Sequence, residues 1–311
     1  MSNQNTIRID FLSKRLLAFI LSTILIVISV GSLATQGLKK GIDFTGGTLV
    51  EISFEEPADL TVLRELLDST GFKGAVLKHF GSSKEVLIRL MPNDAVNTAT
   101  LSNKVLDVVN NQFPQKAELR RAEFVGPQVG EELTEDGGLA LLYALICILI
   151  YVTFRFEYRF ALGSVAALAH DVIITLGVFS VFQFEFDLTV LAAILAVIGY
   201  SLNDTIVVFD RVRENFRKLR KGSPTEIVNI SLNQTLGRTI MTSMTTLLVL
   251  LALFFLGGEI IHDFALALII GVFVGTYSSI YVASPITLAL GISKVDLMIV
   301  KVDQDELDKI P

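Results

Sequence analysis

The sequence predicts a polytopic α-helical membrane protein with six transmembrane helices and one external α+β domain between the first two helices. Its 311 residues are 51% hydrophobic and only 19% charged, and their mean hydropathy is +0.60, which is too apolar for a soluble chain. Six apolar runs are long enough to cross a bilayer as helices. A polar stretch, residues 36–137, separates the first run from the second and cannot reside in lipid.

Composition excludes several classes of protein. The single cysteine, Cys147, cannot close an intrachain disulfide. The net charge of −6 averages segments of opposite charge, and no basic domain indicates a nucleic-acid partner. The residues suggest neither a metal nor a cofactor, and we expect none.

The six runs define the predicted spans, each near the roughly 20 residues that a helix needs to cross the hydrocarbon. They are residues 16–35, 138–154, 160–183, 188–209, 237–257 and 264–290. Ser32 and Ala34 have the spacing of a signal peptidase site. The first run is, however, longer than a signal core of about 7–15 residues, so we expect an uncleaved anchor.

Basic residues in the short loops predict the orientation, because they resist translocation. They occur before the first span, between the second and third, between the fourth and fifth, and after the sixth: Arg8, Lys14, Arg15, Arg155, Arg159, Arg211, Arg213, Arg217, Lys218, Arg220, Lys221 and Lys294. The opposite short loops contain acidic residues and no Lys or Arg. We therefore expect cytoplasmic termini (1–15 and 291–311), a basic cytoplasmic loop (210–236) and an external domain (36–137).

The external domain alternates between strand and helix periodicities. Strand-like alternation occurs over 48–54, 75–80, 85–91 and 117–125, and helical spacing over 59–70 and 94–113. The resulting order, βαββαβ, is that of the ferredoxin-like fold. Its only histidine, His79, has no catalytic companion, so we expect this domain to bind rather than to catalyse.

Charged residues within the spans are candidates for a functional site, because a charge near the bilayer centre costs about 2.5 kcal/mol or more. Asn203 and Asp204 lie in the fourth span, and Arg238 begins the fifth. Asp204 precedes Arg211 by seven residues and is about 10 Å inside the membrane, too deep for its short side chain to reach water. Arg238 could reach toward water or toward Asp204, and the pair could be a proton relay or a static packing contact.

Hydroxyl side chains follow Arg238 on one face of the fifth span. Thr242, Thr245 and Thr246 follow it at i+4, i+7 and i+8, and Thr239, Ser243 and Thr246 form an overlapping stripe. Such a face could hold water and relay a proton. It could equally form ordinary hydrogen bonds between helices.

The third span contains His170 and Asp171, which are adjacent in the chain. Neighbouring side chains on a helix point about 100° apart, so the two need not face one partner. Histidine titrates near neutral pH, which suits proton handling. The alternative, slightly favoured, is that Asp171 accepts a hydrogen bond from another helix and His170 packs beside it.

Small residues form a continuous ridge along the sixth span at a spacing of four: Ala267, Gly271, Gly275, Ser279 and Ala283. Such ridges allow helices to approach closely. The ridge predicts an interface, either within this chain or with another subunit. Pro285 near the end of the span predicts a kink.

Five motifs in order along the chain support a family resemblance. They are GIDFTGG at 41–47, FVGPQVG at 124–130, GYSLNDTIVVFDRVREN at 199–215, TLGRTIMTSMTTLL at 235–248 and GTYSSIYVA at 275–283. With the predicted topology, they resemble the SecF family, the smaller subunits of the bacterial SecDF protein-export complex.

The resemblance implies the fold of the resistance-nodulation-division exporters, in which two six-span halves form one bundle. Asp204 matches the family's coupling carboxylate and Arg238 its intramembrane arginine. The implied function is non-enzymatic export of precursor proteins across the bacterial inner membrane with the proton motive force, although Na⁺ also fits as the coupling ion. The implied partners are a SecD subunit, the SecYEG translocon, YajC and the translocating polypeptide.

Three other functions fit parts of the sequence. Half of a proton-coupled efflux transporter would use the same carboxylate but usually has larger external domains. An intramembrane aspartyl protease could use Asp171 and Asp204, but its Gly-x-Gly-Asp motif is missing. A membrane scaffold would hold both acids as static contacts.

Overall fold

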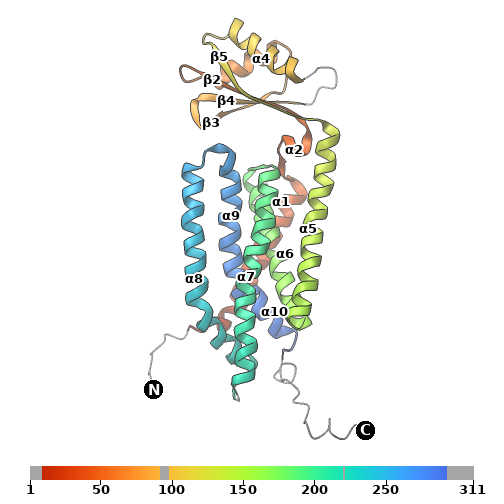
Figure 1. Cartoon of the computed structure of the whole chain (residues 1–311), viewed down its shortest axis with the longest axis vertical. Coiled ribbons are helices and arrows are strands. Elements are labelled where there is room, and N and C mark those ends of the chain that lie inside the picture. The colour runs from red at the N-terminus through yellow and green to blue at the C-terminus, as the bar shows by residue number, and fades with distance from the viewer. Residues whose placement is uncertain (1–8, 92–97, 220, 293–311) are drawn as a thin grey trace, which may run out of the picture.

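A computed structural model describes residues 9–91, 98–219 and 221–292. It consists of a bundle of long helices with a small α+β domain at one end (Figure 1). In these residues, six helices are long and apolar enough to cross a membrane. The predicted fold class is confirmed.

The bundle helices are α1 (Arg15–Thr35), α5 (Pro127–Arg155), α6 (Tyr158–Phe182), α7 (Leu188–Lys218), α8 (Pro224–Leu256) and α9 (Glu259–Ser278). A short 3₁₀ turn, η1 (Leu12–Lys14), precedes α1. The helices α6 and α7 are largely buried at the centre, whereas α1, α5 and α8 expose many large apolar side chains. That exposed surface suits a lipid or a partner helix rather than water.

Three helices extend well beyond the apolar runs from which they were predicted. The helix α5 begins at Pro127 rather than at 138, and α7 continues to Lys218. The helix α8 begins at Pro224, so most of the predicted loop 210–236 is helical. Its start is fixed by a capping box in which Ser223 and Glu226 bond each other's backbone N–H groups, a signal that hydropathy does not record.

Parts of the orientation prediction lie outside the described residues, including Arg8, Arg220, Lys294 and most of both termini. The described segment Ile9–Phe11 binds α8: Ile9 N–H donates to Asn233 Oδ1 at 2.8 Å and Phe11 N–H to Asn229 Oδ1 at 3.0 Å. The start of α1 and the start of α8 therefore lie together, at the end of the bundle far from the α+β domain (Figure 1).

The sixth span is broken near its end. After α9, a π-helical turn, η2 (Ser279–Ala283), leads into α10 (Ser284–Ala289). Pro285 lies in the first turn of α10, where its missing N–H is tolerated. The interruption predicted from Pro285 thus takes the form of a π turn, a feature frequent at functional sites.

The α+β domain is built from β2 (Gly47–Phe54), α3 (Leu60–Ser69), β3 (Val76–Phe80), β4 (Ser82–Leu90), α4 (Thr98–Gln112) and β5 (Ala117–Val125). Its strands pair antiparallel in the order β3-β4-β2-β5, which is the ferredoxin-like topology that the sequence predicts. Val50, Ile52, Leu63 and Val105 are fully buried in its core. The predicted start of the second helix, at 94, lies outside the described residues.

Among the contacts that join segment 36–137 to the bundle, two involve the residues that precede β2. The first is between a short helix, α2 (Ile42–Thr45), and the start of α5, where a Cβ on Gly130 would lie 2.9 Å from the backbone N of Gly46. The second is a parallel pairing of β1 (Lys39–Lys40) with β6 (Glu185–Phe186). Glu185 also pairs with Lys78 and Arg89 of the sheet, at 3.3 and 3.8 Å.

Candidate functional site

Asp204 is buried in the middle of the bundle, with 8% of its surface exposed. The Thr239 hydroxyl of α8 donates to its Oδ1 at 2.7 Å, and the Ser279 hydroxyl of η2 donates to its Oδ2 at 3.1 Å. The carboxyl group therefore joins three helical segments. Because both partners are neutral hydroxyls, a charge on Asp204 has no contacting cation to balance it in the described residues.

The small ridge of the sixth span brings Ser279 to Asp204. A Cβ on Gly271 would lie 2.1 Å from Val197 Cγ2, and one on Gly275 would lie 2.9 Å from the Cβ of Ser201. Both neighbours belong to α7, so the ridge packs within this chain. Gly271 and Gly275 thus let α9 approach α7 closely enough for the Ser279 hydroxyl to reach the carboxylate.

Arg238 does not contact Asp204. It is exposed, and it makes no hydrogen bond or ion pair from its side chain within the described residues. Asn203 and Thr242 are exposed as well. These three polar side chains lie on exposed surfaces of α7 and α8, and the relay role of Asp204 and Arg238 stays a prediction.

The hydroxyl residues of α8 divide into two groups. Thr239 and Ser243 are buried and bond other helices, because Ser243 Oγ lies 2.8 Å from Thr276 Oγ1 of α9. Thr242 and Thr246 instead donate to carbonyls of their own helix. Thr239 and Ser243 thus bond other helices, whereas in the described residues the exposed Thr242 and the half-buried Thr246 bond only carbonyls of α8.

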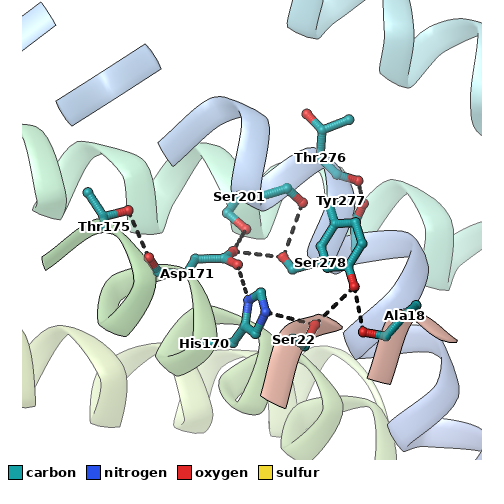
Figure 2. A network of polar contacts seen from close by, with 11 residues as sticks. Ala18, Ser22, His170, Asp171, Thr175, Ser201, Thr276, Tyr277 and Ser278 are labelled. Atoms are coloured by element: carbon teal, nitrogen blue, oxygen red, sulfur yellow. Dashed lines mark hydrogen bonds and ion pairs between the residues drawn. The ribbon is translucent and has the colours of Figure 1, made fainter. Parts of the chain in front are cut away.

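A second buried carboxylate, Asp171 of α6, lies in its own network, which Figure 2 shows. Ser201 and Ser278 donate to its Oδ2 at 2.6 and 2.8 Å, and His170 Nδ1 lies 2.9 Å from its Oδ1. Asp171 is 1% exposed and His170 is 4% exposed. The imidazole turns back onto the adjacent carboxylate, whereas the other partners of the two side chains differ: Ser22 for His170, and Ser201 and Ser278 for Asp171.

The two carboxylates do not form a protease-like dyad. No hydrogen bond links Asp171 to Asp204, and each has its own serine donor. An aspartic protease requires two carboxyl groups that share one proton. In the described residues there is also no group of three or more His, Cys, Asp and Glu side chains that could hold a metal ion.

Sequence reasoning identified Thr239 as part of a polar stripe and Ser279 as part of the packing ridge. It missed four contributors: Ser22, Ser201, Tyr277 and Ser278. Ser201 and Ser278 lie within the motifs at 199–215 and 275–283, and polar residues inside a span are the only local signal that could have found them.

Known proteins share this arrangement of residues along the chain. Residues 31–58 match the family described as the SecD/SecF GG motif, and residues 104–293 match protein export membrane protein SecD/SecF, C-terminal. A relative from Vibrio alginolyticus, named protein translocase subunit SecF, is 55% identical and covers 97% of both chains. This chain belongs to the SecF family.

Other SecF proteins are similarly close. The SecF of Escherichia coli O157:H7 is 48% identical over 96% of this chain and 93% of its own length. The SecF of Pseudomonas aeruginosa is 51% identical over 93% of this chain and 94% of its own. Both bear the same name, protein translocase subunit SecF.

Solved SecDF structures share the fold. SecDF from Thermus thermophilus, described as a translocon-associated membrane protein, is 40% identical, with a TM-score of 0.83 over 93% of this chain. A second structure, SecDF in a super-membrane-facing form, is 41% identical, with a TM-score of 0.69 over 91% of this chain. This SecF chain spans 39% of either SecDF chain.

Proposed function

We propose that this SecF protein assists the export of precursor polypeptides by using the proton motive force, and that Asp204 carries the coupling proton. The observation that supports this is a buried carboxylate held by two neutral hydroxyls and no contacting cation. In the low-dielectric interior of the bundle the ionised form of such a group is costly, so the gain or loss of its proton changes the free energy of the surrounding packing. Its protonation state would therefore favour one packing of α7, α8 and η2 over another.

The energy available is sufficient to shift such an equilibrium. One elementary charge that crosses the membrane gains about 2.3 kcal/mol per 100 mV. A difference of about 1.4 kcal/mol already changes a two-state ratio tenfold. Helix movements caused at Asp204 would reach the external domain through the Gly46–Gly130 contact and through Glu185.

The partner that would complete the bundle is a SecD subunit. This chain corresponds to 39% of a SecDF chain, and its helices α5 and α8 expose apolar surface. Arg238, Asn203 and Thr242 lie exposed on α7 and α8. We assign these surfaces to the contact with SecD, where Arg238 would meet Asp204, the buried carboxylate that no cation contacts in the described residues.

The inferred location is the bacterial inner membrane, with cytoplasmic termini and an external α+β domain. The positive-inside rule supports it, because Arg155 and Arg211 lie at the ends of α5 and α7 far from the domain (Figure 1). The SecYEG translocon, YajC and the precursor chain would be the further partners. The relatives' names support a role in transport rather than in catalysis.

The substitution Asp204→Asn tests this function, because it keeps the shape and removes the titratable proton. We expect normal assembly with SecD and continued ATP-driven translocation, but at least a tenfold loss of the stimulation by an imposed ion gradient. Precursor uptake into inner-membrane vesicles with and without the gradient measures this. Asp210→Asn is the matched control, because Asp210 is on the same helix but half-exposed and paired with Arg155. Stimulation at the parental level in the Asp204→Asn protein would refute the proposal.

A further inference from the structure

The network around His170 continues to α1 as a line of hydrogen bonds (Figure 2). His170 Nε2 lies 3.1 Å from Ser22 Oγ, and Ser22 Oγ lies 3.0 Å from Tyr277 Oη. Tyr277 Oη donates to the Ala18 carbonyl at 2.8 Å. Together with the contact between Asp171 and His170, these are four consecutive links that join α6, α1 and α9.

The four links require four protons, and the protons can be counted. The acceptor at the end, Ala18 O, has none to give, and the hydroxyls of Ser22 and Tyr277 have one each. The remaining two must come from His170 and Asp171 together. A neutral imidazole beside an ionised carboxylate holds only one proton, so one link would place two lone pairs at about 3 Å from each other, which is repulsive.

We propose that the His170–Asp171 pair is a second proton-binding site of this protein, distinct from Asp204, and that it holds one proton in the conformation described here. The proton lies either on the imidazole, as imidazolium and carboxylate, or on the carboxyl group beside a neutral imidazole. Both forms give the pair no net charge, which suits its burial. In both forms Nε2 of His170 carries a hydrogen and donates it to Ser22.

The pair has a route for proton exchange. His170 and Ser22 line a cavity of about 890 Å³ between α1, α6, η2, α10 and the start of α8, and Arg15 lies in the wall of the same cavity. The lining is largely apolar, and its polar side chains are those of Arg15, Ser22, Thr23, His170, Thr225 and Tyr281. A proton that leaves His170 through Ser22 would therefore enter this cavity rather than the site of Asp204.

The other groups that contact the pair in the described residues carry no charge. Asp171 receives only the hydroxyls of Ser201 from α7 and Ser278 from α9, besides His170. Tyr277 stacks on His170, with ring centroids 6.1 Å apart, and Tyr281 of η2 lies beyond it and lines the cavity. Among the described residues of α1, α5, α7, α9, η2 and α10, no Lys, Arg, Asp or Glu forms a hydrogen bond or ion pair with either member.

Loss of this proton would weaken the attachment of α1. With one proton fewer, the remaining proton stays on Nδ1, because a bare Nδ1 would face an ionised carboxylate; either the link from His170 to Ser22 or that from Ser22 to Tyr277 then loses its hydrogen bond. Both links end on Ser22 of α1, the helix that leads directly into the external domain. The protonation state of the pair would thus set how firmly α1 is held against α6 and α9.

Nitrogen NMR of His170 tests the proton count directly. The chain has three histidines, so His79→Gln and His262→Gln leave His170 as the only ¹⁵N-labelled imidazole. In the full chain reconstituted with SecD in lipid vesicles at neutral pH, we expect a protonated Nε2. A bare Nε2 with a hydrogen on Nδ1 would mean an ionised Asp171 beside a neutral imidazole, and it would overturn the proposal.

Tyr277→Phe supplies an independent test. It removes the tyrosine hydroxyl, so only the links from Asp171 to His170 and from His170 to Ser22 remain. A neutral imidazole and the Ser22 hydroxyl can supply the two hydrogens that these links need, without the extra proton. We therefore expect the Nε2 hydrogen to be lost at a pH about one unit lower, a tenfold fall in proton affinity. Tyr281→Phe is the control, because the Tyr281 hydroxyl makes no hydrogen bond among the described residues.

An equal response of the two tyrosine variants would refute the role of the chain of hydrogen bonds. The same titration in an Asp204→Asn background separates this proposal from the proposed coupling function. We expect the His170 signal to be unchanged there, whether or not Asp204 carries the coupling proton. A signal that changes with Asp204→Asn as it does with Tyr277→Phe would show one shared site and contradict the assignment of a second one.

Discussion

Ser278 and Ser279 are neighbours in the chain, yet their hydroxyls donate to two different buried carboxylates, Asp171 of α6 and Asp204 of α7. Successive side chains on a helix point about 100° apart, which allows one helix to contact two others. The two serines lie where α9 passes into the π turn η2. A movement of this junction would alter the hydrogen bonds of both carboxylates together.

The hydroxyl of Thr239 should matter because, among the described residues, it is one of the two groups that donate to the Asp204 carboxylate. We expect Thr239→Ala to lower gradient-stimulated translocation several-fold and to destabilise the protein by about 1–3 kcal/mol, since a buried carboxylate loses a partner. Thr239→Ser keeps the donor and should remain close to the parent. Thermal unfolding and vesicle translocation measure the two effects.

Thr245→Ala is the matched control for that series. Thr245 lies on the same helix but is exposed, and in the described part of the chain its hydroxyl bonds only the carbonyls of Met241 and Thr242. It should behave like the parent in both assays. If Thr239→Ala and Thr245→Ala have equal effects, the Thr239 hydroxyl has no special role at Asp204.

The contact between α9 and α7 should be intolerant of added volume. A methyl group on Gly271 would meet Val197 at 2.1 Å, so we expect Gly271→Ala to destabilise the protein by about 1–3 kcal/mol, measured as a lower Tm in detergent. Val197→Ala should partly rescue it by making room. Gly237→Ala in α8, where nothing lies within 4 Å, should be neutral or slightly stabilising. A parental Tm for Gly271→Ala would show that the helices do not pack this closely.

The joint between the external domain and the bundle should depend on Gly130. Its Cβ would lie 2.9 Å from Gly46 N and 3.0 Å from the Phe44 carbonyl carbon, both backbone atoms that cannot swing away. We expect Gly130→Ala to increase hydrogen exchange in α2 and the first turns of α5 and to reduce translocation. Gly138→Ala, in the same helix with open space around it, is the control. Unchanged exchange in the Gly130→Ala protein would mean that the joint is not a close backbone contact.

Much of the fold could be predicted from sequence, because hydropathy and strand alternation are local signals. Six spans and the βαββαβ order are of that kind. The ends of the helices were less predictable, since polar turns such as those after Pro224 are fixed by the capping box of Ser223 and Glu226. Hydropathy measures only the apolar part of a helix.

The site was predictable only in part, for a different reason. Asp204 could be found because an acidic residue inside an apolar run stands out from its immediate neighbours in the sequence. Its donors come from other helices, and Ser22 approaches His170 across 148 residues of sequence. No periodicity along one segment specifies such a contact. Arg238 was expected near Asp204 from similar depth alone, and depth does not specify that its side chain lies on the exposed side of α8 without a direct contact to the carboxylate.

Arg238 should be required for coupling but not for the stability of this chain. It is exposed and makes no side-chain hydrogen bond or ion pair in the described residues, so its removal leaves no buried group unpaired. We expect Arg238→Leu to change the free energy of unfolding by less than about 0.5 kcal/mol, which would appear as an almost unchanged Tm. In complex with SecD, the same substitution should abolish stimulation by the ion gradient.

The conservative substitution separates charge from geometry. Arg238→Lys keeps the positive charge but loses the planar fork that can bind a carboxylate through two hydrogen bonds, so a partial loss of stimulation is expected. Arg211→Leu is the control, because Arg211 lies at the end of α7, where it pairs with Glu214. Translocation into vesicles and co-purification with SecD would be measured together. Full stimulation in the Arg238→Leu complex would exclude Arg238 from the relay, and loss of SecD from that complex would assign it to assembly instead.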